Sequence, residues 1–83
     1  MIRIDDSYQG GVAVTPSDTV SINFPSGTQY SKGIYVGVTG DVTALMASGE
    51  TLTFKDLPIG IHRLSVQRIN STGTVATNIL ALY

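Results

Sequence analysis

The 83-residue sequence lacks cysteine and tryptophan altogether and has few charged residues. The absence of cysteine excludes disulfide bonds and thiolate metal sites, which many small domains use to become stable. A single domain of this length buries only about 60–65% of the surface that its unfolded chain exposes. We therefore expect added stabilisation from self-association or from docking on a larger body.

Charge is scarce as well: charged residues make up 13% of the chain, and the formal net charge is −1. Binding to nucleic acid requires a face of clustered Lys and Arg, so we expect no nucleic-acid partner. The mean hydropathy is positive, at +0.21, whereas a free monomer usually carries about a quarter or more of charged residues on its surface. This balance indicates a surface covered by neighbouring chains; the alternative is a plain soluble β domain with a Thr/Ser surface.

Long apolar stretches are also missing. No segment approaches the roughly 18 consecutive apolar residues of a membrane span. The segment Met1–Asp6 has no apolar core of the kind that a signal peptide requires. We therefore expect no membrane partner and no export through a signal peptide.

Apolar and polar residues alternate in short runs, which is the pattern of β-strands, and no window keeps a helical period. Turn signals rich in Gly, Pro, Asn and Asp separate these runs. The alternation predicts six strands, over residues 19–24, 34–38, 42–46, 51–55, 62–69 and 76–83. The fold class that we expect is all-β: a small antiparallel β-sandwich or barrel of about six to eight short strands.

Two of these predicted strands have unusual patterns. In segment 62–69, Leu64 and Val66 share one face while Ile61 and Ile69 fall on the other, which indicates a bulge or a strand buried on both faces. The final run, 79–83, is apolar on both faces, as a central or covered strand would be. Residues 1–15 are weakly patterned and are expected to form an N-terminal arm or edge strand, with a single β domain over 16–83.

The sequence contains no set of residues that points to catalysis. His62 is the only histidine, and no serine is placed by its spacing to act with it as a nucleophile. A half-exposed strand or turn histidine is the simpler interpretation. The six carboxylates show no calcium-loop spacing. We therefore expect no enzyme activity, no catalytic residues, no cofactor and no metal.

Four side chains are the candidates for contacts with a partner: Tyr35, Arg63, Arg68 and Tyr83. Tyrosine and arginine are enriched at protein interfaces, where tyrosine combines a large rigid area with a polar tip. Tyr35 alternates out of phase with Ile34 and Val36, so it is expected to face away from the core. The alternative for such a residue is an isolated surface tyrosine without a partner.

Four motifs stand in a fixed order along the chain: VTPSD at 14–18, IYVGVTGDV at 34–42, LPIG at 57–60 and VQRINSTGTVATNILALY at 66–83. This series resembles a group of small virion proteins of tailed bacteriophages and gene transfer agents, described as head spike-base or minor structural proteins. The resemblance covers Val12–Tyr83. One departure is Gln29–Lys32, where such proteins often carry an arginine-rich lead into the following strand.

The resemblance implies a non-enzymatic virion structural protein, assembled in the host cytoplasm and present in many copies. Its role would be that of a capsid decoration (cement) protein or of the base of a head spike or fibre. The implied partners are the major capsid protein or other virion proteins, further copies of the chain in a homo-oligomer, and a fibre protein. Two alternatives stay open: a tail or head–tail adaptor component, and a host-surface or carbohydrate-binding module.

Overall fold

The computed structural model describes residues 8–25 and 27–83, and these residues form seven β-strands and no helix. The strands are β1 (Gly11–Ala13), β2 (Gly33–Val38), β3 (Gly40–Met46), β4 (Thr51–Leu57), β5 (Gly60–His62), β6 (Val66–Ile69) and β7 (Thr77–Leu82). The expected all-β fold class is confirmed. The described residues contain no helix that is long and apolar enough to cross a membrane.

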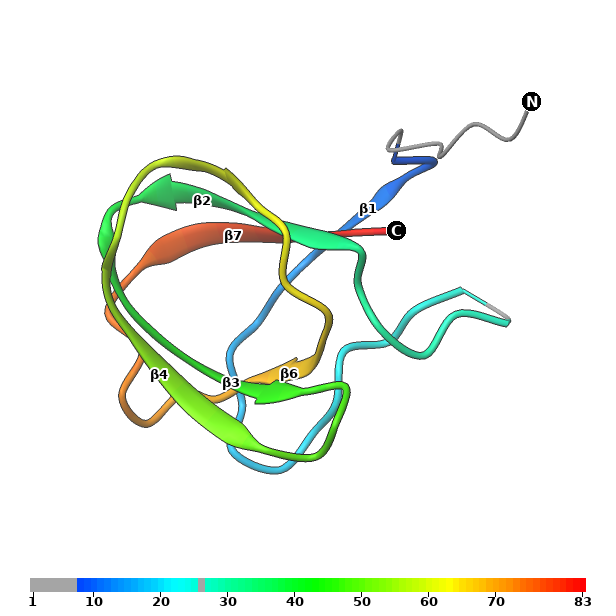
Figure 1. Cartoon of the computed structure of the whole chain (residues 1–83), viewed down its shortest axis with the longest axis horizontal. Coiled ribbons are helices and arrows are strands. Elements are labelled where there is room, and N and C mark those ends of the chain that lie inside the picture. The colour runs from blue at the N-terminus through cyan, green and yellow to red at the C-terminus, as the bar shows by residue number, and fades with distance from the viewer. Residues whose placement is uncertain (1–7, 26) are drawn as a thin grey trace.

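The strands form two antiparallel sheets that pack face to face as a sandwich (Figure 1). The first sheet has four strands in the order β1-β7-β2-β5, and the second has three in the order β4-β3-β6. The chain passes from one sheet to the other four times: between β2 and β3, β4 and β5, β5 and β6, and β6 and β7. Each sheet therefore depends on the other for the cover of its inner face.

The inner faces are built from the alternating apolar residues that the sequence pattern identifies, because successive side chains of a strand point to opposite faces. Fully or almost fully buried side chains come from both sheets: Ile34, Val36, Ile79 and Ala81 from the first, and Val42, Ala44, Val66 and Ile69 from the second. β-branched residues dominate this set, which suits a pleated, well-packed surface.

The strand predicted over residues 19–24 is wrong, because these residues form an irregular extended segment. The hydroxyl of Ser17 accepts hydrogen bonds from the N–H groups of Thr19 (3.2 Å) and Val20 (3.0 Å), so these two groups are used in a local turn. The segment still runs beside β6, since the N–H of Ser17 donates to the Ile69 carbonyl and that of Ile22 to the Gln67 carbonyl. It covers the edge of β6 without forming a regular ladder.

The single long strand predicted over residues 62–69 is also wrong. The structure divides it into β5 in the first sheet and β6 in the second. The change of phase in the sequence has two causes: the chain changes sheets over residues 63–65, and the register shifts where β6 pairs with Leu45 and Met46 of β3. The pairing of β6 with β3 thus contains a bulge or irregularity, and the strand is shorter than predicted.

Both ends of the described chain lie together in the first sheet (Figure 1). β7 is a central strand between β1 and β2, as its apolar run predicts. β1 lies at the edge of the sheet, with Val12 opposite Ala81. Residues 1–7 of the predicted arm or edge strand lie outside the described residues.

Candidate interaction surface

The outer face of the first sheet carries a continuous row of side chains across all four strands. The register places Ala13 opposite Leu80, Leu80 opposite Tyr35, and Tyr35 opposite Ile61. Ile61 is 55% exposed and Leu80 is 39% exposed, which are high values for such apolar side chains. The row is therefore apolar and accessible, with a single polar atom in the Tyr35 hydroxyl.

No charged side chain points outward from the strand residues of this sheet. Besides the row, the outward positions hold Gly11, Gly33, Gly37, Asn78 and Leu82. The glycines keep the face low: a Cβ on Gly37 would lie 2.7 Å from the Cβ of Asn78, and one on Gly33 would lie 2.8 Å from the Tyr8 hydroxyl. A flat, uncharged sheet face of this kind is suited to contact with another protein.

A shallow hollow of about 350 Å³ lies within this face. It is lined by residues of β2, β7 and the β1 region: Ala13, Val14, Tyr35, Asn78, Ile79 and Leu80. Asn78 has a left-handed backbone (φ 55°), which asparagine tolerates better than most residues. Its amide is the polar group on the rim of the hollow.

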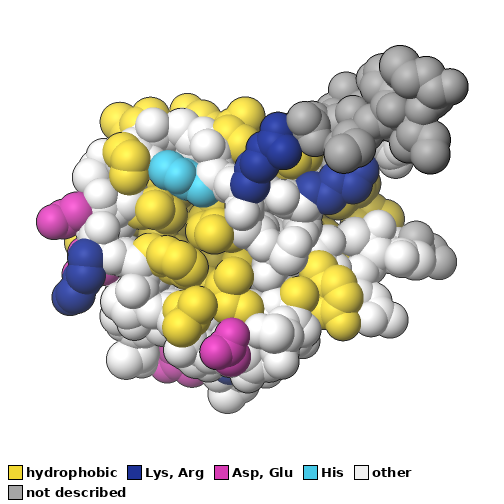
Figure 2. Space-filling model, viewed as in Figure 1, with side chains coloured by type: hydrophobic (Ala, Val, Ile, Leu, Met, Phe, Trp, Pro, Cys, Tyr) yellow, Lys and Arg dark blue, Asp and Glu magenta, His cyan; other side chains and the backbone are white. Residues whose placement is uncertain are grey.

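A second group of exposed apolar side chains lies on the side of the sandwich that is seen in Figure 2, where yellow side chains gather below the cyan histidine. Two further exposed large hydrophobic residues are Leu52 on β4 and Ile59 in the link between β4 and β5. Charged residues flank Leu52 along the chain, with Glu50 before it and Lys55 after it. The outer face of the first sheet is the more continuous of the two surfaces.

The four contact residues predicted from the sequence lie in different places. Tyr35 lies in the row on the outer face and is half-buried. Arg63 is exposed in the link between β5 and β6. Arg68 lies opposite Leu45 in the second sheet, and its Nε donates to the Asn70 side-chain oxygen at 2.8 Å. These three side chains do not share one site.

Tyr83, the fourth candidate, makes its contacts with other residues of the same chain. Its ring packs edge-to-face on Phe24, with ring centres 6.4 Å apart at 86°. Its N–H donates to the Gly10 carbonyl, and its own carbonyl accepts from Gln9 and Gly10. A Cβ on Gly10 would lie 2.7 Å from the Tyr83 hydroxyl. The residue therefore anchors the segment before β1 to the end of β7.

Of the row, the sequence pattern singles out Tyr35 alone, and the two large apolar members that it misses are Leu80 and Ile61. In the sequence, Ile61 is out of phase with Leu64 and Val66, and Leu80 belongs to a run that is apolar on both faces. Leu80 and Ile61 join Tyr35 in one row because β7 and β5 both pair with β2. Alternation within a single strand does not show which strands pair with each other.

The side chain of His62, the only histidine of the chain, makes a structural hydrogen bond. His62 Nε2 donates to the Pro58 carbonyl oxygen at 2.7 Å, which ties β5 to the end of the preceding turn. Among residues 8–25 and 27–83, no three His, Asp or Glu side chains come together as a possible metal site.

The two carboxylates with a shifted pKa are also structural. The N–H of Asp56 and the Lys55 ammonium donate to Asp41, and together they hold the pKa of Asp41 below its usual value. The hydroxyl and the N–H of Thr72 act in the same way on Asp18 and lower its pKa. Both carboxylates thereby hold neighbouring turns in place.

Comparison with known proteins identifies the fold. No protein-family model matches the chain, and no curated protein matches it in sequence. Among solved structures, the chain is similar to one from the "Capsid of native GTA particle computed with C5 symmetry", that is, of a gene transfer agent. The superposition covers 100% of this chain and 92% of that chain, with a TM-score of 0.78 and 19% sequence identity. The protein thus has the fold of a chain found in a gene transfer agent capsid.

Proposed function

We propose that this protein is a non-enzymatic structural component of a virion of the tailed-bacteriophage or gene-transfer-agent kind. In this proposal it docks on the major capsid protein or on another virion protein, as a decoration (cement) protein or as the base of a head fibre. The observation that carries the proposal is the uncharged apolar row Ala13–Leu80–Tyr35–Ile61 on the outer face of the first sheet. The fold shared with a chain of a gene transfer agent capsid and the motif resemblance over Val12–Tyr83 support the choice of particle.

The physical reason for docking is the exposure of this row. Burying the accessible parts of Ile61 and Leu80 contributes on the order of 1 kcal/mol for each residue. Tyr35 adds a rigid aromatic area whose hydroxyl donates or accepts a hydrogen bond at the partner surface. Arg63 follows Ile61 by two residues and is exposed, so it belongs to the polar rim of the same contact. Arg68 and Tyr83 lie outside this contact.

The area of this face limits how strongly a single copy of the protein can bind. Four strands about 4.8 Å apart and six residues at about 3.3 Å give a face of roughly 15 by 20 Å. This is below the roughly 800 Å² per partner of a standard stable interface. A single docked copy is therefore weakly bound. Many copies on a repeating surface, or several linked copies on one symmetric site, gain strength through effective concentration.

The test is the composition of purified particles. Quantitative mass spectrometry should find the chain in many copies relative to the major capsid protein, and an antibody against it should label the outside of the head. A copy number of a few per particle, with labelling confined to the tail, would contradict decoration of the capsid. Complete absence from washed particles would refute the proposal as a whole.

A further inference from the structure

The edge strand β1 has one side that no described residue pairs with. Towards β7, the N–H of Val14 donates to the Ile79 carbonyl at 2.9 Å, Val12 lies opposite Ala81, and Gly10 exchanges hydrogen bonds with Tyr83. In an antiparallel ladder, alternate residues point their N–H and C=O groups to opposite sides. The main-chain groups of Gly11, Ala13 and Thr15 therefore point away from β7, at the open edge of the sheet.

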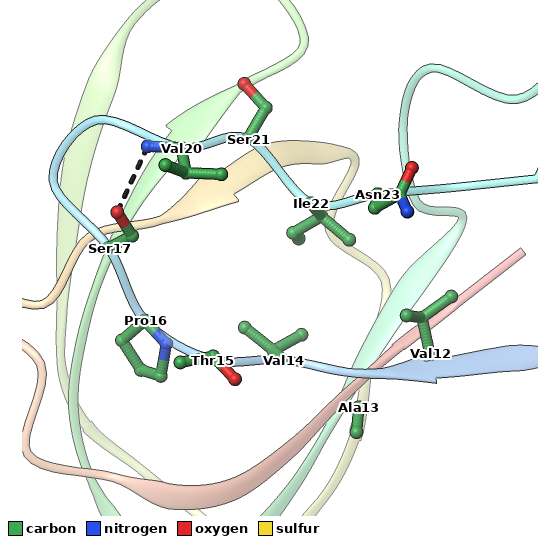
Figure 3. A pocket seen from close by; sticks show the side chains of 10 residues that line it. All are labelled: Val12, Ala13, Val14, Thr15, Pro16, Ser17, Val20, Ser21, Ile22 and Asn23. Carbon is green, nitrogen blue, oxygen red and sulfur yellow. Dashed lines mark hydrogen bonds between the residues drawn. The ribbon is translucent and has the colours of Figure 1, made fainter.

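A second extended segment lies next to this edge, in the layer of the second sheet. In Figure 3, residues 12–17 and 20–23 run side by side, with Val14 and Ile22 pointing into the space between them. The N–H of Ile22 is turned towards β6, where it donates to the Gln67 carbonyl at 3.0 Å. An open cavity of about 510 Å³ lies between the two segments, lined mainly by the apolar side chains Val12, Val14, Val20 and Ile22. The core of the sandwich is thus open along this side.

The other sheet edges carry features that oppose strand addition, and β1 does not. β4 has Lys55 on it, a register shift in its pairing with β3, and a left-handed residue at Asp56 (φ 50°). Charges and bulges of this kind protect edges from pairing with other chains. β6 is covered by residues 17–22, and β5 is three residues long and is followed by Arg63. From Tyr8 to Ser17 there is no charged residue.

We propose that the occupant of this edge is a second copy of the same chain, which pairs β1 with β1 in antiparallel orientation about a two-fold axis at Ala13. At the two-fold axis Ala13 faces its own counterpart, and its neighbours face other residues of the same short strand. A strand with like charges would therefore repel itself, whereas this one is neutral. The open edge is self-complementary: Gly11 pairs with Thr15 of the second copy, Ala13 with its equivalent, and Thr15 with Gly11. The same rotation sets residues 20–23 of the two copies next to each other and covers Val20, which is 68% exposed.

The dimensions indicate how strong such a dimer is. The paired stretch of five residues is about 17 Å long, and the two layers lie about 10 Å apart, so the area is well below that of a standard interface. The main-chain pairing and the closure of the two cavities therefore give a reversible, concentration-dependent dimer. Dimer formation is measured on the isolated protein. Its test is therefore independent of the test for a role in the particle.

A cysteine scan tests the geometry directly, since the natural chain contains no cysteine. In the proposed pair, the two Cα atoms at position 13 lie about 5.5 Å apart, within the range that a disulfide spans. Ala13→Cys should therefore form a disulfide-linked dimer rapidly under mild oxidation. The matched control Thr39→Cys places an exposed cysteine in the turn between β2 and β3, at the left of Figure 1 and away from β1, and should stay mainly monomeric. Equal cross-linking of both variants would refute the β1 pairing.

A second pair of variants tests the pairing without a covalent bond. Ala13→Pro removes the N–H that faces the open edge and leaves the β1–β7 hydrogen bonds in place, because Ala13 does not donate to β7. Sedimentation velocity from about 10 μM to about 1 mM, a range that brackets weak dimers, should show concentration-dependent dimers for the natural chain and for Ala13→Thr. The Ala13→Pro variant should remain monomeric with an unchanged far-UV circular dichroism spectrum. A natural chain that is monomeric at the highest concentration, or an oligomer that Ala13→Pro leaves intact, would overturn the inference.

Discussion

The outer faces of the two sheets differ in whether the chain itself completes them. On the second sheet, Thr43 points outward and yet is only 7% exposed. Its hydroxyl donates to the Gly73 carbonyl at 3.1 Å and lies 3.0 Å from the Thr53 hydroxyl, while its N–H donates to the Thr74 hydroxyl. The loop after β6 therefore satisfies the polar groups of this face. On the outer face of the first sheet, Ile61 and Leu80 are exposed, and no loop within residues 8–25 and 27–83 covers them.

This difference between the two outer faces indicates which of them gains more from contact with a partner. A face whose polar groups are paired within the chain gains little from further contacts, because its hydrogen bonds are already made. A face with exposed aliphatic side chains and no charge gains from any complementary apolar surface. The two outer faces of this small sandwich are thus specialised, one for the stability of the fold and one for association.

The largest effect is expected from a charge placed on the associating face. Leu80→Lys puts an ammonium group in the centre of the row, where docking would have to bury it at a cost that exceeds the gain of the contact. We expect the copy number of the protein on purified particles to fall by about tenfold or more, which corresponds to about 1.4 kcal/mol. Quantitative mass spectrometry of washed particles measures this loss.

The matched control places the same charge on the other sheet. Thr51 is exposed on β4, opposite Leu45 on the outer side of the second sheet. Thr51→Lys should leave incorporation unchanged, because this face is not the docking face. If Thr51→Lys removes the protein from particles and Leu80→Lys does not, the assignment of the two faces is reversed.

The next largest effect concerns the place where the chain crosses between the sheets. Ser31 is 2% exposed, and its hydroxyl donates to the Leu64 carbonyl (2.7 Å) and accepts from the Val66 N–H (3.0 Å). Ser31→Ala leaves both main-chain groups without this partner at a buried position. We expect a loss of about 2–3 kcal/mol in the free energy of unfolding, measured by urea denaturation. Ser48→Ala, at an exposed hydroxyl, should change it by less than about 0.5 kcal/mol.

The sequence predicts the fold class and the strands with clean alternation, and it fails where a side chain competes for the backbone. Alternation places Ile34 and Val36 in the core, and the final run that is apolar on both faces identifies β7 as a central strand. Residues 19–24 alternate equally well, but the Ser17 hydroxyl takes two of their N–H groups, and propensity does not weigh that competition. The importance of Ser31 is invisible in the sequence because its partners lie 33 and 35 residues away.

The candidate surface was predictable in part, for a related reason. Tyr35 was identified from its phase within one strand, which is local information. Its neighbours Leu80 and Ile61 come from strands that pair with β2 through long-range contacts, and the pairing partners of a strand are not encoded in its own pattern. The sequence also favours Arg68 as a contact residue, but the chain changes sheets between β5 and β6, so Arg68 lies in the other sheet from Tyr35.

A smaller loss of stability is expected from the polar network of the second sheet. Thr43→Val keeps the shape of the side chain but removes the hydroxyl that links Thr53 and Gly73. Since the Gly73 carbonyl and the Thr53 hydroxyl lose a partner near the surface, the free energy of unfolding should fall by about 1–2 kcal/mol. The same change at an exposed threonine of the first sheet, Thr77→Val, should leave it nearly unchanged. Equal effects in urea denaturation would contradict the specialisation of the second sheet.

The smallest effect is the pH dependence, and it too belongs to the side of the second sheet. The pKa of Asp18 is lowered by the hydrogen bonds from the Thr72 hydroxyl and N–H, and that of Asp41 by the Asp56 N–H and then by Lys55. A carboxylate whose pKa is lower in the folded state stabilises the fold above its unfolded value of about 3.9, and loses this contribution as the pH falls through the folded pKa. Stability should therefore decline below about pH 4. The effect should be modest, because both carboxylates are exposed to solvent and salt.

Replacement of one carboxylate separates its share of this decline. Asp18→Asn removes the charge that accepts from Thr72, so the variant should be less stable than the natural chain at neutral pH. The difference should shrink as the pH falls below about 4, because protonation then removes the same charge from the natural chain. Chemical denaturation at a series of pH values measures both curves. A constant difference at every pH would show that Asp18 acts through its shape and not through its charge.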